Sequence, residues 1–172
     1  RAAGTGVTAR LALVGAPGCG KTAVAAELAE RWSCPLLDTD ALYEQEHGSS
    51  VGDAVIDDEL AFRADEEQIV LDALRQPAGV VAVGSGAMSE AVRRALVALP
   101  VVWLQVGLVD AVRRSGLAGI RPVALGNIRA QMADMMAERA PWYEACADLV
   151  VATDGRAVAG VADEIEEWEK SR

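Results

Sequence analysis

The residues best suited to chemistry in this chain are the eight from Gly15 to Thr22, which read GAPGCGKT. Their spacing is that of the phosphate-binding loop G-x-x-x-x-G-K-[ST]. Glycines allow the backbone to wrap closely around phosphate oxygens, and backbone N–H groups with the positive end of the following helix face the anion. Lys21 is predicted to reach the β- and γ-phosphates of a nucleotide, and the Thr22 hydroxyl to ligate Mg²⁺. The remaining loop contacts are expected from Gly18, Cys19 and Gly20.

Two acids and an arginine–glutamate pair form further candidate groups. Asp38 and Asp40 follow a short apolar run, and strand alternation would place both carboxylates on the same side. Two such acids near a phosphate loop suit Mg²⁺ and a substrate hydroxyl. Arg63 and Glu66 are three residues apart on one helical face, so Arg63 could bind a carboxylate with both of its donors while Glu66 orients it. Taken alone, this pair is better explained as an ordinary surface ion pair.

Three later segments carry weaker signals. The turn Gly84-Ser85-Gly86 follows an apolar run and could be purely structural. Residues 116–122, GLAGIRP, have the composition of a mobile lid that carries an arginine, Arg121. Arg139 precedes the segment APWY.

The charge balance limits the possible partners. A net charge of −10 argues against nucleic acid and anionic membranes, which require a basic face. The acidic excess is attributed to solvated helix faces such as residues 163–169. Only Lys21 and Lys170 among the 16 basic residues are lysines, so the loop lysine marks a position that needs a compact point charge.

The cysteines and the single histidine add little chemistry. Cys19, Cys34 and Cys146 show neither disulfide nor metal-site spacing, which suits a reducing compartment. Cys19 differs from the others because a helix N-terminus favours the thiolate, so its oxidation or alkylation could block nucleotide binding. His47 is expected at the surface end of a helix and not as a catalytic base.

The elements that position these groups alternate between strand and helix patterns, which predicts an α/β fold with a parallel sheet covered by helices. The chain is expected to form one domain, with residues 1–9 as a flexible lead-in, and to be cytoplasmic, because it has no long apolar run. Ligands of such sheets gather at the carboxyl ends of the strands. The predicted strands are 10–14, 35–37, 80–83, 101–105 and 149–152. The predicted helices are 21–32, 58–75, 89–98, 108–114, 127–147 and 157–170.

The order of these motifs resembles that of shikimate kinases. The segments GAPGCGKT, LLDTD, FRADE, the GSGA turn, IRP and ERAPWY carry the resemblance, which runs from about residue 11 to residue 152. It implies a three-layer P-loop kinase fold, like that of nucleoside-monophosphate kinases, with strand order 2-3-1-4-5. It further implies a substrate-binding region at 40–75 and a lid at 115–126. The implied activity is ATP-dependent phosphorylation of the 3-hydroxyl of shikimate, on the pathway to chorismate and the aromatic amino acids.

The resemblance also implies a role for each matching residue. Lys21 would stabilise the transferring phosphoryl group, while Thr22, helped by Asp38 through water, would hold Mg²⁺. Asp40 would position the attacking hydroxyl and accept its proton. The shikimate carboxylate would be bound by Arg63, which Glu66 holds in place, and by Arg139. A substrate hydroxyl would contact the turn of Gly84, Ser85 and Gly86. Arg121 would contact the phosphates, and Arg114 would lie near adenine.

Two positions depart from the family pattern. Ser85 stands where these enzymes usually have the middle glycine of Gly-Gly-Gly, and Asp58-Glu59 replaces a usual Gly-Glu before Phe62. The second change concerns only a helix start, where Asp is a favourable cap.

Two other functions are alternatives to a shikimate kinase. Another small-molecule kinase, of the gluconate or nucleoside-monophosphate type, should lack the paired arginines that bind a carboxylate. A non-catalytic nucleotide-binding relative should have lost Lys21, Asp40 or Arg121, and all three are present. As a shikimate kinase, the protein is expected to be a monomer whose partners are shikimate and ATP.

Overall fold

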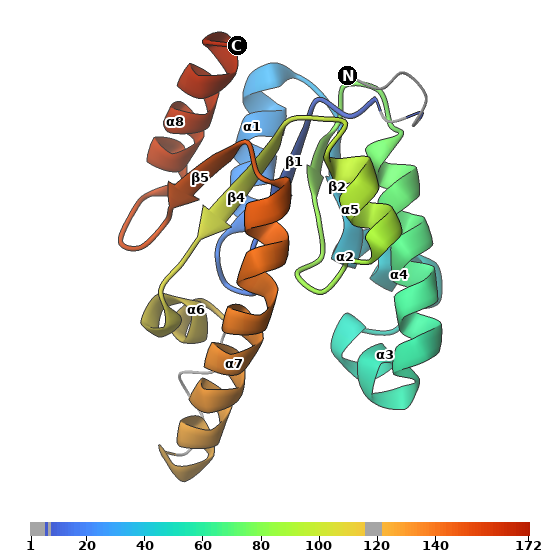
Figure 1. The fold of residues 1–172 in the computed structure, drawn as a ribbon, viewed down its shortest axis with the longest axis vertical. Coiled ribbons are helices and arrows are strands. Elements are labelled where there is room, and N and C mark those ends of the chain that lie inside the picture. The colour runs from blue at the N-terminus through green and yellow to red at the C-terminus, as the bar shows by residue number, and fades with distance from the viewer. Residues whose placement is uncertain (1–5, 7, 116–121) are drawn as a thin grey trace.

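The fold is a parallel sheet of five strands in the order β2-β3-β1-β4-β5, with helices on both faces (Figure 1). It is seen in a computed structural model that describes residues 6, 8–115 and 122–172, and only the backbone of 122–126. The strands are β1 (Leu11–Val14), β2 (Leu36–Asp38), β3 (Val80–Ala82), β4 (Val101–Gln105) and β5 (Leu149–Ala152). The helices are α1 (Lys21–Trp32), α2 (Thr39–His47), α3 (Val51–Asp57), α4 (Glu59–Leu74), α5 (Glu90–Leu96), α6 (Leu108–Arg114), α7 (Pro122–Cys146) and α8 (Val158–Lys170). The predicted fold class and strand order are confirmed.

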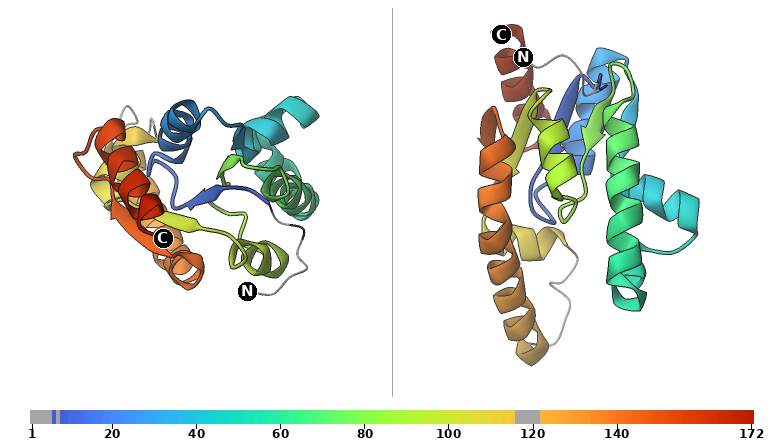
Figure 2. Two further views of the ribbon diagram at one scale, coloured as in Figure 1. Left: turned by 90° about the horizontal axis from the view of Figure 1, so that it is seen from above. Right: turned by 45° about the vertical axis from the view of Figure 1, so that its right-hand side comes forward.

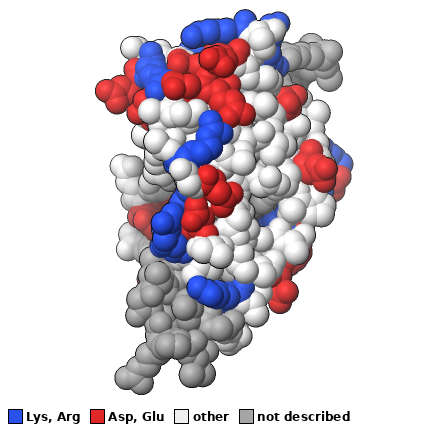
Figure 3. Space-filling model, turned by 90° about the vertical axis from the view of Figure 1, so that its left-hand side faces the viewer, with Lys and Arg blue, Asp and Glu red and all other residues white. Residues whose placement is uncertain are grey.

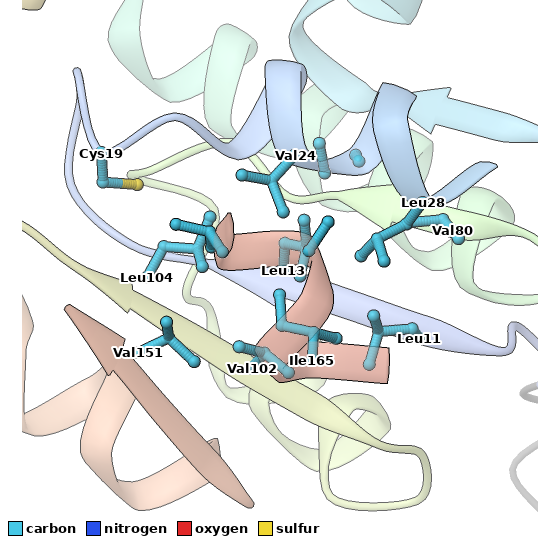
Figure 4. Packing of buried hydrophobic residues seen from close by; sticks show 14 of the residues in the cluster. Leu11, Leu13, Cys19, Val24, Leu28, Val80, Val102, Leu104, Val151 and Ile165 are labelled. Carbon is cyan, nitrogen blue, oxygen red and sulfur yellow. The ribbon is translucent and has the colours of Figure 1, made fainter. Parts of the chain in front are cut away.

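The central strand β1 has no exposed side. Successive side chains of a strand point to opposite faces of the sheet, and helices cover both faces here. Leu11 and Leu13 pack into a cluster with α1 and α8, as Figure 4 shows. Ala12 and Val14 belong to a second cluster, which α4, α5 and α7 complete on the other face. All four side chains are fully buried. An apolar run without polar alternation is therefore what this strand requires.

The predicted elements are largely confirmed, but the predicted helices did not include α2 and α3, although His47 was expected at a helix end and does end α2. The short helices α2 and α3 fill the segment between β2 and α4, and they leave few buried positions for a periodic pattern to reveal. Consequently the expectation that Asp38 and Asp40 lie on one side of an extended strand is wrong. Asp38 ends the strand and caps α2, since its side chain accepts hydrogen bonds from the N–H groups of Asp40 and Ala41.

The helices α4 and α7 run beyond the carboxyl ends of the strands, on either side of the region where the sheet ends (Figure 2). Helix α4 begins after Asp58, whose side chain accepts from the N–H of Ala61, so this departure from the family pattern is a helix cap as expected. Helix α7 begins at Pro122, earlier than predicted, and proline is well tolerated at a first helical position. Residues 116–121 of the expected lid, Arg121 included, lie outside the described residues.

The start of the chain and the last helix are tied to the domain by specific contacts. Within the expected flexible lead-in, the N–H groups of Thr8 and Ala9 both donate to the Leu74 carbonyl, so these two residues are held in place. The acidic face of α8 is also more than a solvated surface. Its side chains form ion pairs with other elements: Asp163 and Glu166 with Arg31, Glu164 with Arg156, and Glu169 with Arg10. Figure 3 shows acidic and basic side chains interleaved on this side of the molecule.

The described parts of the chain, 8–115 and 122–172, contain no helix that is both long enough and apolar enough to cross a bilayer.

Candidate active site

The phosphate loop connects the buried end of β1 to the first residue of α1. Gly18 and Gly20 adopt φ angles of 76° and 97°, in the left-handed region that favours glycine. Lys21 folds back over the loop, and its Nζ donates to the carbonyl oxygens of Gly15 at 2.8 Å and Ala16 at 3.1 Å. The lysine therefore holds its charge at the loop before any phosphate arrives.

Cys19 contributes no reactive thiol to this loop. Its side chain is fully buried in the cluster beneath α1. The Sγ atom lies 3.6 Å from Lys21 Nζ, within the same closed loop. Reagents in solvent do not reach this sulfur in the folded chain, so the expected sensitivity to alkylation finds no support.

Asp38 links the start of α1 to the start of α2. Its Oδ2 accepts a 2.5 Å hydrogen bond from the Thr22 hydroxyl, while its Oδ1 caps α2. One carboxylate is thus held from both sides, and its Oδ2 lies beside the hydroxyl of the phosphate loop. Two adjacent oxygen ligands of this kind suit Mg²⁺, which retains several waters and takes its other ligands from phosphates.

Asp40 lies in the first turn of α2, facing the turn that follows β3. A Cβ atom added to Gly84 would come within 2.6 Å of Asp40 Oδ1 and 3.1 Å of Glu66 Oε1, so a larger residue there would displace these two carboxylates. Burial raises the pKa of the Asp40 carboxyl, and the nearby Asp38 charge raises it further. Lys21 and Arg63 act in the opposite direction. A raised pKa makes this carboxylate a better proton acceptor than an ordinary aspartate.

Arg63 and Glu66 form a partly buried pair rather than the surface pair that the two residues alone suggested. Arg63 Nη1 donates to Glu66 Oε2 at 2.7 Å, and the Glu66 side chain is buried. The Arg63 guanidinium also lies against Gly86, where an added Cβ would meet its central carbon at 3.0 Å. Burial raises the pKa of Glu66, an effect that Arg63 partly offsets. Its Nη2 also lies 3.6 Å from Glu59 Oε1, so two acids of α4 hold the arginine next to the turn.

Arg139, on α7, reaches the same region from the opposite side. Burial raises the pKa of Glu66 and of Tyr143, one turn further along α7, and the charge of Arg139 partly offsets both rises. Helix α7 thus places the Arg139 charge near the glutamate that pairs with Arg63, while Asp40 lies on α2. Asp40, Arg63 and Arg139 were all candidates in the sequence.

The nucleotide end of the site is an open cleft of about 450 Å³ that joins the phosphate loop to Asp40 and Ser85. Arg114 borders it at the end of α6, where the guanidinium donates to the Thr153 carbonyl at 2.7 Å and to Asp110 Oδ2 at 3.1 Å. A second hollow continues past Arg114 toward Gly155 and Arg156. Together, the cleft and this hollow extend from Asp40 past Arg114 at the end of α6.

The turn at Ser85 tolerates its serine. Ser85 has a negative φ, so a side chain causes no backbone strain. A Cβ at either neighbouring glycine would instead displace a side chain of the site, Asp40 at Gly84 and Arg63 at Gly86. A side chain at the family's middle glycine therefore leaves the geometry of Asp40 and Arg63 unchanged.

Two residues of this region were not singled out in the sequence. Thr39 is buried between the two acids, and its Oγ1 accepts a 2.8 Å hydrogen bond from the Gly84 N–H. Tyr143 is buried in the second cluster, and its hydroxyl donates to the Ser85 carbonyl at 2.5 Å. A polar residue inside DTD and a tyrosine four residues after Arg139 were the available signals.

Comparison with known proteins identifies the family. The sequence model described as shikimate kinase matches residues 17–169, most of the chain. The chain belongs to the shikimate kinase family. A shikimate kinase of Thermobifida fusca is 46% identical over 143 residues, covering 82% of this chain and 83% of the relative. One of Salinispora arenicola is 43% identical over 155 residues, covering 89% and 93%.

A solved structure of another family member agrees with the fold. Shikimate kinase from Acinetobacter baumannii in complex with shikimate superposes with a TM-score of 0.87 at 27% identity, covering 96% of this chain and 94% of that one. Membership in the shikimate kinase family makes this chain an ATP-dependent kinase. The same match disfavours a gluconate or nucleoside-monophosphate kinase.

Proposed function

We propose that this chain transfers the γ-phosphoryl group of ATP to the 3-hydroxyl of shikimate, which yields shikimate 3-phosphate and ADP. The observation that carries the proposal is the continuous cleft from the phosphate loop to Asp40 and Ser85, with Arg63 next to the same turn. The A. baumannii relative, whose structure contains shikimate, supports the choice of acceptor.

The arginines on α4 and α7 would bind the carboxylate of shikimate. Arg63 is oriented by Glu66 at 2.7 Å, so its planar fork is fixed before the substrate arrives. Arg139 adds a second positive charge from α7. Two arginines that bind the substrate from different helices would favour an acceptor that is an anion with planar geometry.

Asp40 would position the attacking hydroxyl. Its carboxylate lies against Gly84, in the cleft that also contains Lys21. The raised pKa of Asp40 suits a group that accepts the hydroxyl proton as the bond to phosphorus forms. Backbone N–H groups of Ser85 and Gly86 would hold a neighbouring oxygen of the substrate.

The phosphate loop and the two oxygens beside it would bind the triphosphate. Lys21 would leave the Gly15 and Ala16 carbonyls and donate to the transferring phosphoryl group, whose negative charge it stabilises. Thr22 and Asp38 have the oxygen donors that would hold Mg²⁺. When bound, this ion neutralises phosphate charge and orients the leaving group. Arg114 would lie near adenine, and Arg121, outside the described residues, would approach the phosphates from the lid.

The cellular setting belongs to the same proposal. We expect a monomer in the cytoplasm that acts on two small molecules. The net charge of −10 disfavours nucleic acid and membranes as partners, and free cysteines suit a reducing compartment.

A coupled ADP-release assay tests the function. We expect turnover with shikimate and none above background with gluconate or nucleoside monophosphates, when each is supplied with ATP and Mg²⁺. Phosphorus NMR of the product should show a phosphate monoester on the 3-hydroxyl. Turnover of gluconate or of a nucleoside monophosphate in place of shikimate would contradict the proposal, and the absence of turnover with every acceptor would favour a non-catalytic nucleotide-binding protein.

The arginines should separate by role in steady-state kinetics. Arg63→Ala and Arg139→Ala should raise KM for shikimate by about 10- to 100-fold, since a charge-assisted pair contributes about 1.5–3 kcal/mol. Arg121→Ala should chiefly lower kcat, because a lid arginine acts on the phosphoryl group in the transition state.

A matched control for Arg63 exists at the C-terminal cap of the same helix. Arg75 pairs with Asp72 at 2.7 Å with the same three-residue spacing but on the exposed surface. Arg75→Ala should leave both Michaelis constants within twofold of wild type. Equal effects of Arg63→Ala on the KM values for ATP and shikimate would remove the carboxylate assignment.

Ser85→Gly should change KM for shikimate by less than tenfold, or about 1.4 kcal/mol. The backbone N–H that contacts substrate is present in both residues, and the negative φ of Ser85 means that the serine stores no strain for glycine to release. Wild-type protein that is inactive on shikimate but activated by this substitution would identify Ser85 as a residue that excludes shikimate.

A further inference from the structure

Asp40, Glu66 and Arg63 all lie against the turn of residues 84–86. Its backbone orientation decides where the N–H donors for the substrate lie. These peptide bonds are trans, so each C=O points opposite to the N–H that follows it. Fixing a carbonyl of the turn therefore fixes the direction of the next N–H.

Each peptide unit of the turn is held by a separate hydrogen bond. The Gly84 N–H donates to Thr39 Oγ1 at 2.8 Å, which fixes the unit between Val83 and Gly84. The Gly84 carbonyl accepts from the Ala87 N–H at 3.0 Å, which fixes the Ser85 N–H. The Ser85 carbonyl accepts from the Tyr143 hydroxyl at 2.5 Å, which fixes the Gly86 N–H. Two of these three bonds come from side chains on other helices.

The same bonds leave two donors for a ligand. The N–H groups of Ser85 and Gly86 donate to no acceptor among the residues that the structure describes. Ser85 borders the cleft with the phosphate loop, and Gly86 borders a hollow with Arg63 and Glu66. Backbone donors next to an arginine suit the hydroxyl and carboxylate oxygens of a small polar acid.

We propose that Thr39 and Tyr143 are positioning residues that clamp this turn from α2 and α7, and so aim the Ser85 and Gly86 N–H groups at the acceptor substrate. The inference rests on the proposed function, which makes shikimate that substrate. Thr39 is 2% and Tyr143 1% exposed, so neither side chain contacts a substrate itself. Because Thr39 lies between Asp38, the cap of α2, and Asp40, in its first turn, the clamp also ties the turn to these two acids.

The clamped N–H groups would bind the acceptor equally well in the ground state and in the transition state. Loss of the clamp should therefore weaken binding of the acceptor and leave kcat and ATP binding nearly unchanged. Tyr143→Phe and Thr39→Val should each raise KM for shikimate by about fivefold or more. We expect kcat to fall by less than threefold and KM for ATP to stay within twofold. Thr39→Ser keeps the accepting oxygen and should restore the wild-type KM.

The chain offers a matched control in its other tyrosine. Tyr43 is also buried and packs against Phe62, but no hydrogen bond of its hydroxyl occurs among the described residues. Tyr43→Phe should leave KM for shikimate unchanged. If Tyr43→Phe and Tyr143→Phe raise it equally, a general loss of packing explains both and the clamp is refuted.

A double-mutant cycle separates the clamp from an effect of Tyr143 on its neighbour Arg139. Thr39 and Tyr143 hold one turn from opposite sides, so the double variant should raise KM by less than the product of the single effects. Independent effects that multiply fully would contradict a shared turn.

Amide exchange in the substrate-free protein tests the clamp without any turnover. The Gly84 amide should exchange at least tenfold faster in Thr39→Val than in wild type, while the Val81 amide in the sheet stays protected. Unchanged exchange at Gly84 would overturn the proposal even if the kinetics changed. Wild-type protein that does not phosphorylate shikimate would refute the proposed function, and the exchange measurement would still decide on the clamp.

Discussion

Lys21→Met is expected to lower kcat by about 1000-fold or more while the protein remains folded. Lys21 lies in the phosphate loop, where we propose that its charge stabilises the transferring phosphoryl group, and a loss of this size corresponds to about 4 kcal/mol of transition-state stabilisation. Arg114, on the same cleft, cannot replace it, because its guanidinium is already bound by Thr153 and Asp110. Single-turnover kinetics with saturating ATP and shikimate measure the effect.

Two further variants make this result specific. Lys170, the only other lysine, lies exposed at the end of α8, so Lys170→Met should retain wild-type turnover. Lys21→Arg should fail like Lys21→Met, because a planar fork does not fit a loop shaped for a point charge. Retention of more than about a tenth of wild-type kcat by folded Lys21→Met, checked by circular dichroism, would remove the role assigned to this lysine.

Asp40→Asn is expected to lower kcat by about 100-fold or more and, at neutral pH, to make the substrate-free protein more stable. The loss of turnover follows because an amide accepts no proton from the attacking hydroxyl. The gain in stability follows because the ionised carboxylate is partly desolvated and lies near the Asp38 charge, both of which raise its pKa. Removing such a charge relieves a cost that the folded state bears for function.

The sign of the pH dependence follows from the raised pKa. Between the ordinary carboxyl pKa and the raised value, the folded state binds more protons than the unfolded state, so the wild type loses stability as pH rises through this window. The stability advantage of Asp40→Asn should therefore be largest above the window and disappear below it. In the wild type, kcat/KM should fall on the acid side as pH drops through the raised pKa.

Thermal melts at a series of pH values, beside steady-state kinetics, check both parts. Asp57→Asn is a suitable control, since Asp57 is an exposed residue at the end of α3. The Asp57→Asn variant should keep its melting temperature within about a degree of wild type, and its turnover should be unchanged. An Asp40→Asn variant less stable than wild type at every pH would show that Asp40 makes net favourable contacts, contrary to the direction of its pKa.

Much of this protein follows from local sequence patterns. The phosphate loop, the bounds of α1 and the buried strands were predicted because each depends on neighbouring residues: glycine conformations, a 3.6-residue period and uninterrupted apolar runs. The order of the motifs indicated the family, and through it the strand order. Asp58 as a helix cap likewise needs only the residues that follow it.

Other features depend on residues far apart in the chain. Arg63 and Glu66 alone indicated a surface pair, and only the packing of α4 beside the turn makes Glu66 buried and the pair part of a site. The sequence predicted strand-like alternation of Asp38 and Asp40 after the strand 35–37, whereas the Asp38 cap starts a helix there.

The tertiary structure alone also decided where the turn tolerates a side chain and what holds the turn in place. Ser85 is tolerated because its φ is negative, while a Cβ at Gly84 would displace the carboxylates of Asp40 and Glu66, which come from two other helices. The Tyr143 hydroxyl meets the Ser85 carbonyl across 58 residues of chain. No local period encodes such contacts, because they arise only when the sheet brings the ends of its strands together.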